Sequence, residues 1–264
     1  MPRNFTMNDV TILHEDNSVL VVVKPQNIPS QADKSGDLDL VTLLKQYIKD
    51  KYDKPGEVYL GLVHRLDRPT GGVMVFARNS KSAERLSKQI VDGDMTKQYL
   101  TTVVGRPTDS KGTLVNYLKK NALTNNVYVA TFGDHNAKRA ELSYETLQSD
   151  EQTSLVKVQL ATGRSHQIRV QFAAIGCPVY GDVRYGGDTL SKRGTNLALW
   201  AYRLEFNHPV SKERMVFVAY PPETDPWTRF DVTKHIEVFA DSGYDDDDGI
   251  PLITKKVNST DDLD

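Results

Sequence analysis

Many short segments of this chain have the composition of β-strands, and few helical segments lie between them. This pattern limits the possible folds more than any other feature of the sequence. The clearest of these segments is residues 19–23, five consecutive Val and Leu residues that end before Pro25. A short β-branched run bounded by turn residues is typical of a buried strand. We expect further strands at residues 58–63, 73–77, 99–104, 127–132, 140–147, 155–160, 197–206 and 215–220.

Helical spacing of apolar residues is found in three segments. It predicts an amphipathic helix over residues 38–52, a second that begins at Asn79 or Ser80 and ends near Gly93, and a short third ended by Gly176. Strands and helices do not alternate regularly. The sequence therefore predicts an α+β fold with a mostly antiparallel, mixed sheet flanked by helices.

Charge divides the chain into two regions. The formal net charge of the 264 residues is −2, but residues 1–240 hold 31 Lys and Arg against 27 acids, whereas residues 241–264 hold eight Asp against two Lys. We expect an N-terminal extension at 1–10, one catalytic domain at 11–240 and a mobile acidic tail at 241–264. The positive excess of the main body concentrates in residues 61–106 and 161–193.

Several classes of protein find no support in the sequence. No apolar run has the length of a membrane span, and the N-terminus does not resemble a secretion signal, so a cytoplasmic location is expected. Cys177 is the only cysteine, which excludes an internal disulfide and a cysteine cage for zinc. Phosphate-loop, dinucleotide-binding and zinc-protease motifs are also absent, and no cofactor or metal is expected.

The most unusual segment is residues 61–72, where Asp67 stands between Arg65 and Arg68 and before Pro69. A carboxylate among guanidinium groups is expected to be ionised, so it can be a nucleophile or stabilise a cation, but not act as a general acid at neutral pH. The alternative is a turn residue that binds its own backbone. Composition alone favours that alternative.

Four motifs, in the same order, resemble those of the RluA-type pseudouridine synthases. Residues 61–72, GLVHRLDRPTGG, are similar to the segment whose H-R-L-D ends on the family's nucleophilic aspartate. Residues 160–171, LATGRSHQIRVQ, resemble the T-G-R-x-H-Q-I-R motif, with a glycine-rich stretch following at 176–187. Residues 97–105 resemble the K-x-Y strand, and residues 15–25 resemble the N-terminal pattern. Together they are far more specific than any one short pattern.

The resemblance implies a role for each matching residue. Asp67 would be the catalytic aspartate, Arg169 its basic partner, and Tyr99 would lie against the uracil ring. Arg65 would enter the RNA helix in place of the extruded uridine, because a planar cation can fill a vacated stacking position. The reaction breaks the N1–C1′ bond, rotates the base and joins C5 to C1′, with no cofactor in the net change.

Further residues of these motifs are candidate RNA contacts, namely His64, Arg68, Arg164 and His166. These assignments have structural alternatives. Both histidines can be hydrogen-bonded within the fold, and Arg164 can face solvent. Tyr99, in an alternating strand, can be a core residue. The motifs also depart from the family pattern, since Gly71 replaces a serine, and Gln171 and Cys177 stand where many relatives carry histidine. These departures affect positioning and substrate choice rather than the aspartate, tyrosine or arginine.

The expected partner is structured RNA, a ribosomal or transfer RNA stem-loop, with no DNA or membrane partner and with a monomer plausible. Only about ten residues precede the matching region, whereas many relatives carry an S4-type RNA-binding domain there. We therefore expect the catalytic domain itself to recognise RNA by phosphate contacts and shape. The alternatives are a catalytically inactive RNA-binding scaffold of the same fold, or a hydrolase that uses Asp67, for which no second carboxylate stands out.

Overall fold

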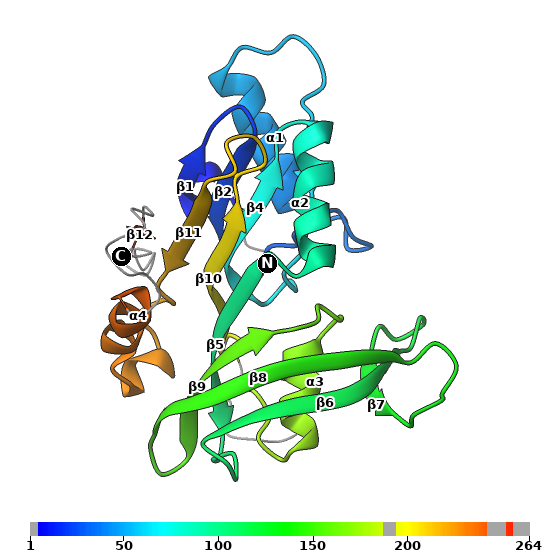
Figure 1. The fold of residues 1–264 in the computed structure, drawn as a ribbon, viewed down its shortest axis with the longest axis vertical. Helices are drawn as coiled ribbons and strands as arrows, with labels where there is room; N and C mark the ends of the chain where they lie inside the picture. The colour runs from blue at the N-terminus through cyan, green and yellow to red at the C-terminus, as the bar shows by residue number, and fades with distance from the viewer. Residues whose placement is uncertain (1–4, 187–193, 242–251, 256–264) are drawn as a thin grey trace. The chain divides into compact units, whose positions relative to one another are not determined.

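The chain forms two compact units, each of which holds its own run of neighbouring strands (Figure 1). The structure is a computed structural model that describes residues 5–186, 194–241 and 252–255. The first unit comprises the described residues of Met1–Thr96, Ala201–Pro222 and Ile236–Asp264, and the second comprises those of Lys97–Trp200 and Glu223–His235. In the described part of the chain, no helix is long and apolar enough to span a bilayer.

The strands of the first unit include two that are fully buried. Its strand order is β1 (Thr11–Glu15), β2 (Val19–Lys24), β4 (Gly71–Ala77), β10 (Leu199–Asn207), β11 (Arg214–Ala219) and β12 (Leu252–Lys255), with the short β3 (Gly61–Leu62) also on β4. Helices α1 (Leu40–Lys51) and α2 (Ser80–Asp92) follow β2 and β4. Every residue of β2 and β4 is buried, which explains why all of these residues except Lys24 are apolar.

The second unit is an antiparallel sheet with a short helix. Its strand order is β5 (Thr96–Val104), β9 (Thr153–Leu160), β8 (Lys138–Ser149), β6 (Lys111–Lys120) and β7 (Val127–Ala130). Helix α3 (Gln167–Ala174) packs on this sheet through Phe172, whose ring meets Tyr144 edge-on at 5.6 Å between centroids. Residues Trp227–Arg229 form a 3-10 turn, and α4 (Val232–Asp241) follows.

The predicted α+β class with a mostly antiparallel mixed sheet is confirmed, since β11–β12 is the one parallel pair among the strand pairs whose register is described. The three predicted helices are also confirmed. Asn79 caps α2 by accepting the Ser82 amide at 2.8 Å, and Gly93 ends it with φ of 84°.

The predicted secondary structure is wrong or incomplete in four places. In the range 58–63 only Gly61–Leu62 form a strand, although Val58 and Leu60 are buried. Burial outside a ladder leaves the same apolar pattern as burial within one. Strand β6 was not predicted, because its exposed and part-buried residues show no continuous apolar run, and β1 and α4 were missed as well.

The predicted domain limits stay a prediction. Most of the acidic segment 241–264 lies outside the described residues, and Leu252–Lys255 are described as β12, which pairs with β11.

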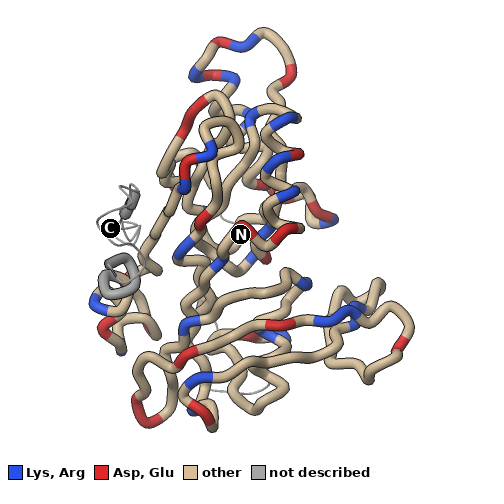
Figure 2. The backbone as a smooth tube through the Cα atoms, viewed as in Figure 1, with Lys and Arg blue, Asp and Glu red and all other residues tan. Residues whose placement is uncertain are grey.

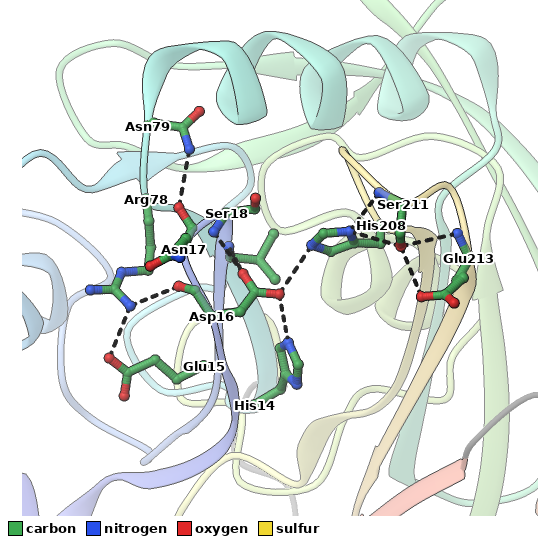
Figure 3. Close-up of polar contacts among 11 residues, drawn as sticks. His14, Glu15, Asp16, Asn17, Ser18, Arg78, Asn79, His208, Ser211 and Glu213 are labelled. Atoms are coloured by element: carbon green, nitrogen blue, oxygen red, sulfur yellow. Dashed lines mark hydrogen bonds and ion pairs between the residues drawn. The ribbon is translucent and has the colours of Figure 1, made fainter.

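Asp16 joins two turns within the first unit (Figure 3). Its Oδ1 accepts the amides of Ser18 and Val19 at 2.6 and 2.8 Å, and its Oδ2 lies 2.9 Å from His14 Nε2 and 3.1 Å from His208 Nε2. Burial by itself raises the pKa of Asp16, but the contacts with the histidines and the two amides outweigh it and lower that pKa. The turn between β1 and β2 is thereby tied to the segment that follows β10.

At Gly72 the backbone of β4 lies close to that of Ala201, which leads to a stability prediction. Its φ is +121°, and a Cβ at this position would lie 2.2 Å from the Ala201 carbonyl oxygen. We expect Gly72→Ala to lower the free energy of unfolding by more than about 3 kcal/mol, measured by urea denaturation, because main-chain atoms must move.

Gly93→Ala is the matched control, since Gly93 has a positive φ of +84° with open space around it. It should lose about 1 kcal/mol. Equal losses in the two variants would show that the close approach at Ala201 is not decisive.

Candidate functional site

The loop between β3 and β4 carries four of the predicted site residues: His64, Arg65, Asp67 and Arg68. The ammonium of Lys24, the last residue of β2, holds this loop by hydrogen bonds to its main chain. Lys24 Nζ donates to the carbonyl oxygens of Thr70 at 2.8 Å and of Arg68 and Pro25 at 3.0 Å each. The side chain is fully buried, so these three bonds replace its hydration.

Residues 26–30 hold the same loop through further hydrogen bonds. Ser30 Oγ donates to the Leu66 carbonyl at 2.7 Å, and the Asn27 amide donates to the Arg68 carbonyl at 2.8 Å. Gln26 Nε2 reaches the Pro69 carbonyl at 3.0 Å. The carbonyl groups on both sides of Asp67 are therefore bonded, and the Asp67 carbonyl itself accepts the Thr70 amide at 3.0 Å. A half-buried carboxylate is thus presented by a backbone that has little freedom to move.

Lys24 and Asp67 also act on one another electrostatically. Burial lowers the pKa of Lys24 to about 7, and the charge of Asp67 opposes this change while that of Arg68 adds to it. The lysine was not among the residues expected from the sequence to form the site. Its signal was a single cation at the end of an otherwise apolar strand.

The other polar residues of the loop differ in their surroundings. Arg65 is exposed, and no hydrogen-bond or ion-pair partner is found for it in the described parts of the chain. Arg68 instead turns to residues 33–37, with Nη1 2.5 Å from Asp37 Oδ2 and Nη2 3.0 Å from Asp33 Oδ2. His64 Nε2 accepts the Val75 amide at 3.1 Å, which binds the loop to β4 and leaves this nitrogen unprotonated.

The second unit carries Tyr99 and Arg169. Tyr99 lies on β5 and is 7% exposed. Arg169 lies on α3, where Nε and Nη2 donate to the two oxygens of Asp182 at 2.7 and 2.8 Å. Its guanidinium also stacks 5.1 Å from the Tyr185 ring centre. This two-point geometry leaves the guanidinium one orientation.

Asp182 was not predicted as a site residue from the sequence. It lies in the glycine-rich stretch 176–187, which was part of the family resemblance. Burial by itself raises the pKa of Asp182, but Arg169 and the amides of Arg184 and Tyr185 outweigh it and lower that pKa. The carboxylate is therefore ionised at neutral pH and balances the charge of Arg169 inside the unit.

The remaining predicted residues surround the start of α3. The Tyr185 hydroxyl accepts the Val127 amide at 2.9 Å and forms a second hydrogen bond with His166 Nδ1, 2.6 Å away. Arg164 is exposed and donates from Nε to the Arg139 carbonyl at 2.9 Å. The structural alternative for His166 thus has direct support in its contact with Tyr185.

The predicted site residues fall into two groups, one in each unit. His64, Arg65, Asp67 and Arg68 share the loop of the first unit, and Tyr99, Arg164, His166 and Arg169 belong to the second. A single site made from both groups stays a prediction. Among the described residues, no cluster of three or more His, Cys, Asp or Glu is arranged to hold a metal.

The buried ammonium of Lys24 generates a prediction about pH. Its pKa of about 7 in the folded chain lies below the roughly 10.4 of an unfolded lysine, so between these values the unfolded chain binds more protons. The free energy of unfolding, relative to that of Lys24→Met, should therefore rise by about 1.4 kcal/mol per pH unit from pH 7 towards pH 10.

Urea denaturation of both proteins at several pH values measures this difference. At pH 7 the variant should be less stable by about 3 kcal/mol, because it leaves three carbonyl groups without their donor. A difference that does not change with pH would contradict the assigned titration.

Comparison with known proteins gives an independent result. A model of the family described as RNA pseudouridylate synthase matches residues 18–174. An uncharacterized RNA pseudouridine synthase of Aquifex aeolicus is 36% identical over 235 residues, which cover 84% of this chain and 72% of that protein. Ribosomal large subunit pseudouridine synthase D of Zymomonas mobilis is 31% identical over 221 residues, which cover 80% of this chain and 69% of that protein.

A solved structure leads to the same family. Human RNA pseudouridylate synthase domain containing 4 is 25% identical, with a TM-score of 0.66 and coverage of 78% of this chain and 86% of that one. The resemblance predicted from the four motifs is therefore confirmed. The family match extends over more than half of the sequence, and this chain belongs to the RNA pseudouridylate synthases.

Proposed function

We propose that the Asp67 carboxylate is the nucleophile with which this RNA pseudouridine synthase isomerises uridine. The observation that carries the proposal is the held loop: Lys24 and Ser30 bind carbonyl groups on both sides of Asp67, while the Asp67 side chain stays half-buried. A nucleophile on a rigid backbone loses little entropy when it attacks. The reaction breaks N1–C1′ and forms C5–C1′, so the base must be released and held while it turns.

Tyr99 and Arg169 are the proposed partners of Asp67. The ring of Tyr99 would give the rotating uracil an aromatic surface to lie against. Arg169 would orient the Asp67 carboxylate, with Asp182 holding the guanidinium in place. Asp182 is then a positioning residue that acts through Arg169.

Arg65 is proposed to replace the extruded uridine in the RNA stack. It is exposed and has no partner among the described residues, so its planar cation is available to RNA. Arg164 is an exposed candidate for a phosphate contact. His64, His166 and Arg68 are also proposed RNA contacts, and the bonds that they make within the chain support a role in shaping the site as well.

The proposed substrate is a structured RNA stem-loop. Curated relatives include proteins named ribosomal large subunit pseudouridine synthase D, which favours ribosomal RNA over transfer RNA. We also propose that the chain acts as a monomer in the cytoplasm, where ribosomal RNA is available to bacterial enzymes of this kind. Cell fractionation and light scattering test the last two points. A protein confined to a membrane fraction, or a stable dimer, would contradict them.

The main prediction concerns Asp67→Asn. The amide keeps the shape of the side chain but removes the nucleophilic charge, so turnover should fall at least about a thousandfold, which is about 4 kcal/mol in the barrier. Release of tritium from RNA labelled at uridine C5 measures turnover, because that hydrogen leaves when C5 joins C1′.

Glu57→Gln is the control, since it makes the same chemical change at an exposed carboxylate before β3. It should retain full activity, and both variants should bind RNA and unfold like the wild type. Full turnover by Asp67→Asn would refute the assignment. A wild-type protein that binds RNA but converts no uridine would favour the inactive scaffold instead.

A further inference from the structure

Strands β6, β7 and β8 present a group of aromatic and basic side chains on one face. In the register of the sheet, Tyr117 lies opposite both Ala130 and Arg139, and Lys119 lies opposite Tyr128. Residues directly opposite one another share a face, as do residues two apart on a strand. Tyr117, Lys119, Tyr128 and Arg139 therefore share one face of the sheet.

The other face of these strands is the covered one. Leu118, Val127 and Ala140 alternate with the group above and form a buried cluster with Val170 of α3. Figure 1 shows α3 behind β6 and β8, so the aromatic face is turned away from the helix. We call this face the outer platform, and it consists of Tyr117, Lys119, Tyr128, Phe132 and Arg139.

Phe132 completes the platform from the turn after β7. Its ring meets that of Tyr117 edge-on, with centroids 5.2 Å apart and planes at 73°. Phe132 nevertheless remains 79% exposed and Tyr128 45% exposed. A single exposed aromatic residue needs no explanation, but two beside a third on one sheet face form a surface on which flat rings can stack.

Charge identifies the occupant of the platform. Residues 117–139 hold four Lys and Arg against one Asp, a net of +3 in a chain whose total is −2. Lys119 shares the face of the platform and has no ion-pair partner among the described residues, whereas Arg139 on the same face pairs with Glu141. Lys120 and Lys138 lie opposite Val127 and Leu118 and so belong to the other face. Figure 2 shows this basic group where β6 and β8 approach β7. Aromatic rings beside the unpaired Lys119 suit nucleotides, whose bases stack and whose phosphates are anionic.

The platform is separate from the proposed position of the target uridine. Tyr99 lies opposite Val158, which lies opposite Tyr144, which lies opposite Gly112. Gly112 is on the same face of β6 as the buried Leu118, six residues along the strand. Tyr99 therefore belongs to the face covered by α3, and the outer platform to the opposite one.

We propose that the outer platform binds an unpaired segment of the substrate RNA, away from the target uridine, by stacking bases on Tyr128 and Phe132 and by contacts of Lys119 with phosphates. This inference rests on the proposed function only in taking RNA as the partner. It adds a recognition surface within the catalytic chain itself.

Binding of an unpaired oligouridylate of twelve nucleotides, measured by fluorescence anisotropy, tests the proposal. The double variant Tyr128→Ala/Phe132→Ala should bind it at least about tenfold more weakly, and a blunt RNA duplex of twelve base pairs equally well. Lys119→Ala should make the dependence of log K on log salt shallower by about 0.7. With a substrate RNA that has unpaired flanks, the double variant should raise KM and leave kcat unchanged.

Two control variants keep the test specific. Val115→Ala removes an exposed apolar side chain from the same face of β6, and Lys81→Ala removes an exposed cation from α2. Neither should change oligouridylate binding. Binding of the oligonucleotide by the double variant with wild-type affinity would overturn the proposal, as would equal weakening by Val115→Ala. Because this assay needs no turnover, its outcome is independent of the Asp67→Asn experiment.

Discussion

A fully buried ammonium group is the interaction on which the catalytic loop depends. Lys24 ends a strand whose other residues are all apolar, and its three donors take carbonyl groups of Pro25, Arg68 and Thr70. A charge in this position is stable only when its hydrogen bonds are complete. The loop must therefore keep one conformation for the core to tolerate the lysine, and that conformation presents Asp67.

The second unit also contains a buried cation, Arg169, but its hydrogen-bond acceptor is a carboxylate. Arg169 is 5% exposed and is balanced by an ionised carboxylate, Asp182, rather than by peptide dipoles. A guanidinium bonded at two points cannot rotate, whereas an ammonium bonded to three carbonyl groups mainly fixes the backbone around it. The two buried cations thus have different consequences, since one orders a loop and the other orders a side chain.

Features that depend on neighbouring residues along the chain were predictable. The cap at Asn79, the left-handed Gly93 and the apolar stripe between them placed α2 almost to the residue, because all three act within a few residues. Range 58–63 failed for the opposite reason. Its apolar residues are buried, but only Gly61 and Leu62 find a partner strand, and partners are distant in sequence. Strand β6 was missed because one of its faces is exposed to solvent.

The family, the α+β class and the motif residues Asp67, Tyr99 and Arg169 could be predicted from the sequence, because motif order and local periodicity are properties of the chain alone. Tertiary structure decided which of the charged residues are already engaged. In the folded chain Arg68 forms ion pairs with Asp33 and Asp37, and Arg169 forms one with Asp182. His166 is hydrogen-bonded to Tyr185, and Arg65 is exposed. These pairings depend on the fold, because the energy of each interaction decreases steeply with the distance between the two groups. The number of residues between two groups in the sequence does not determine that distance.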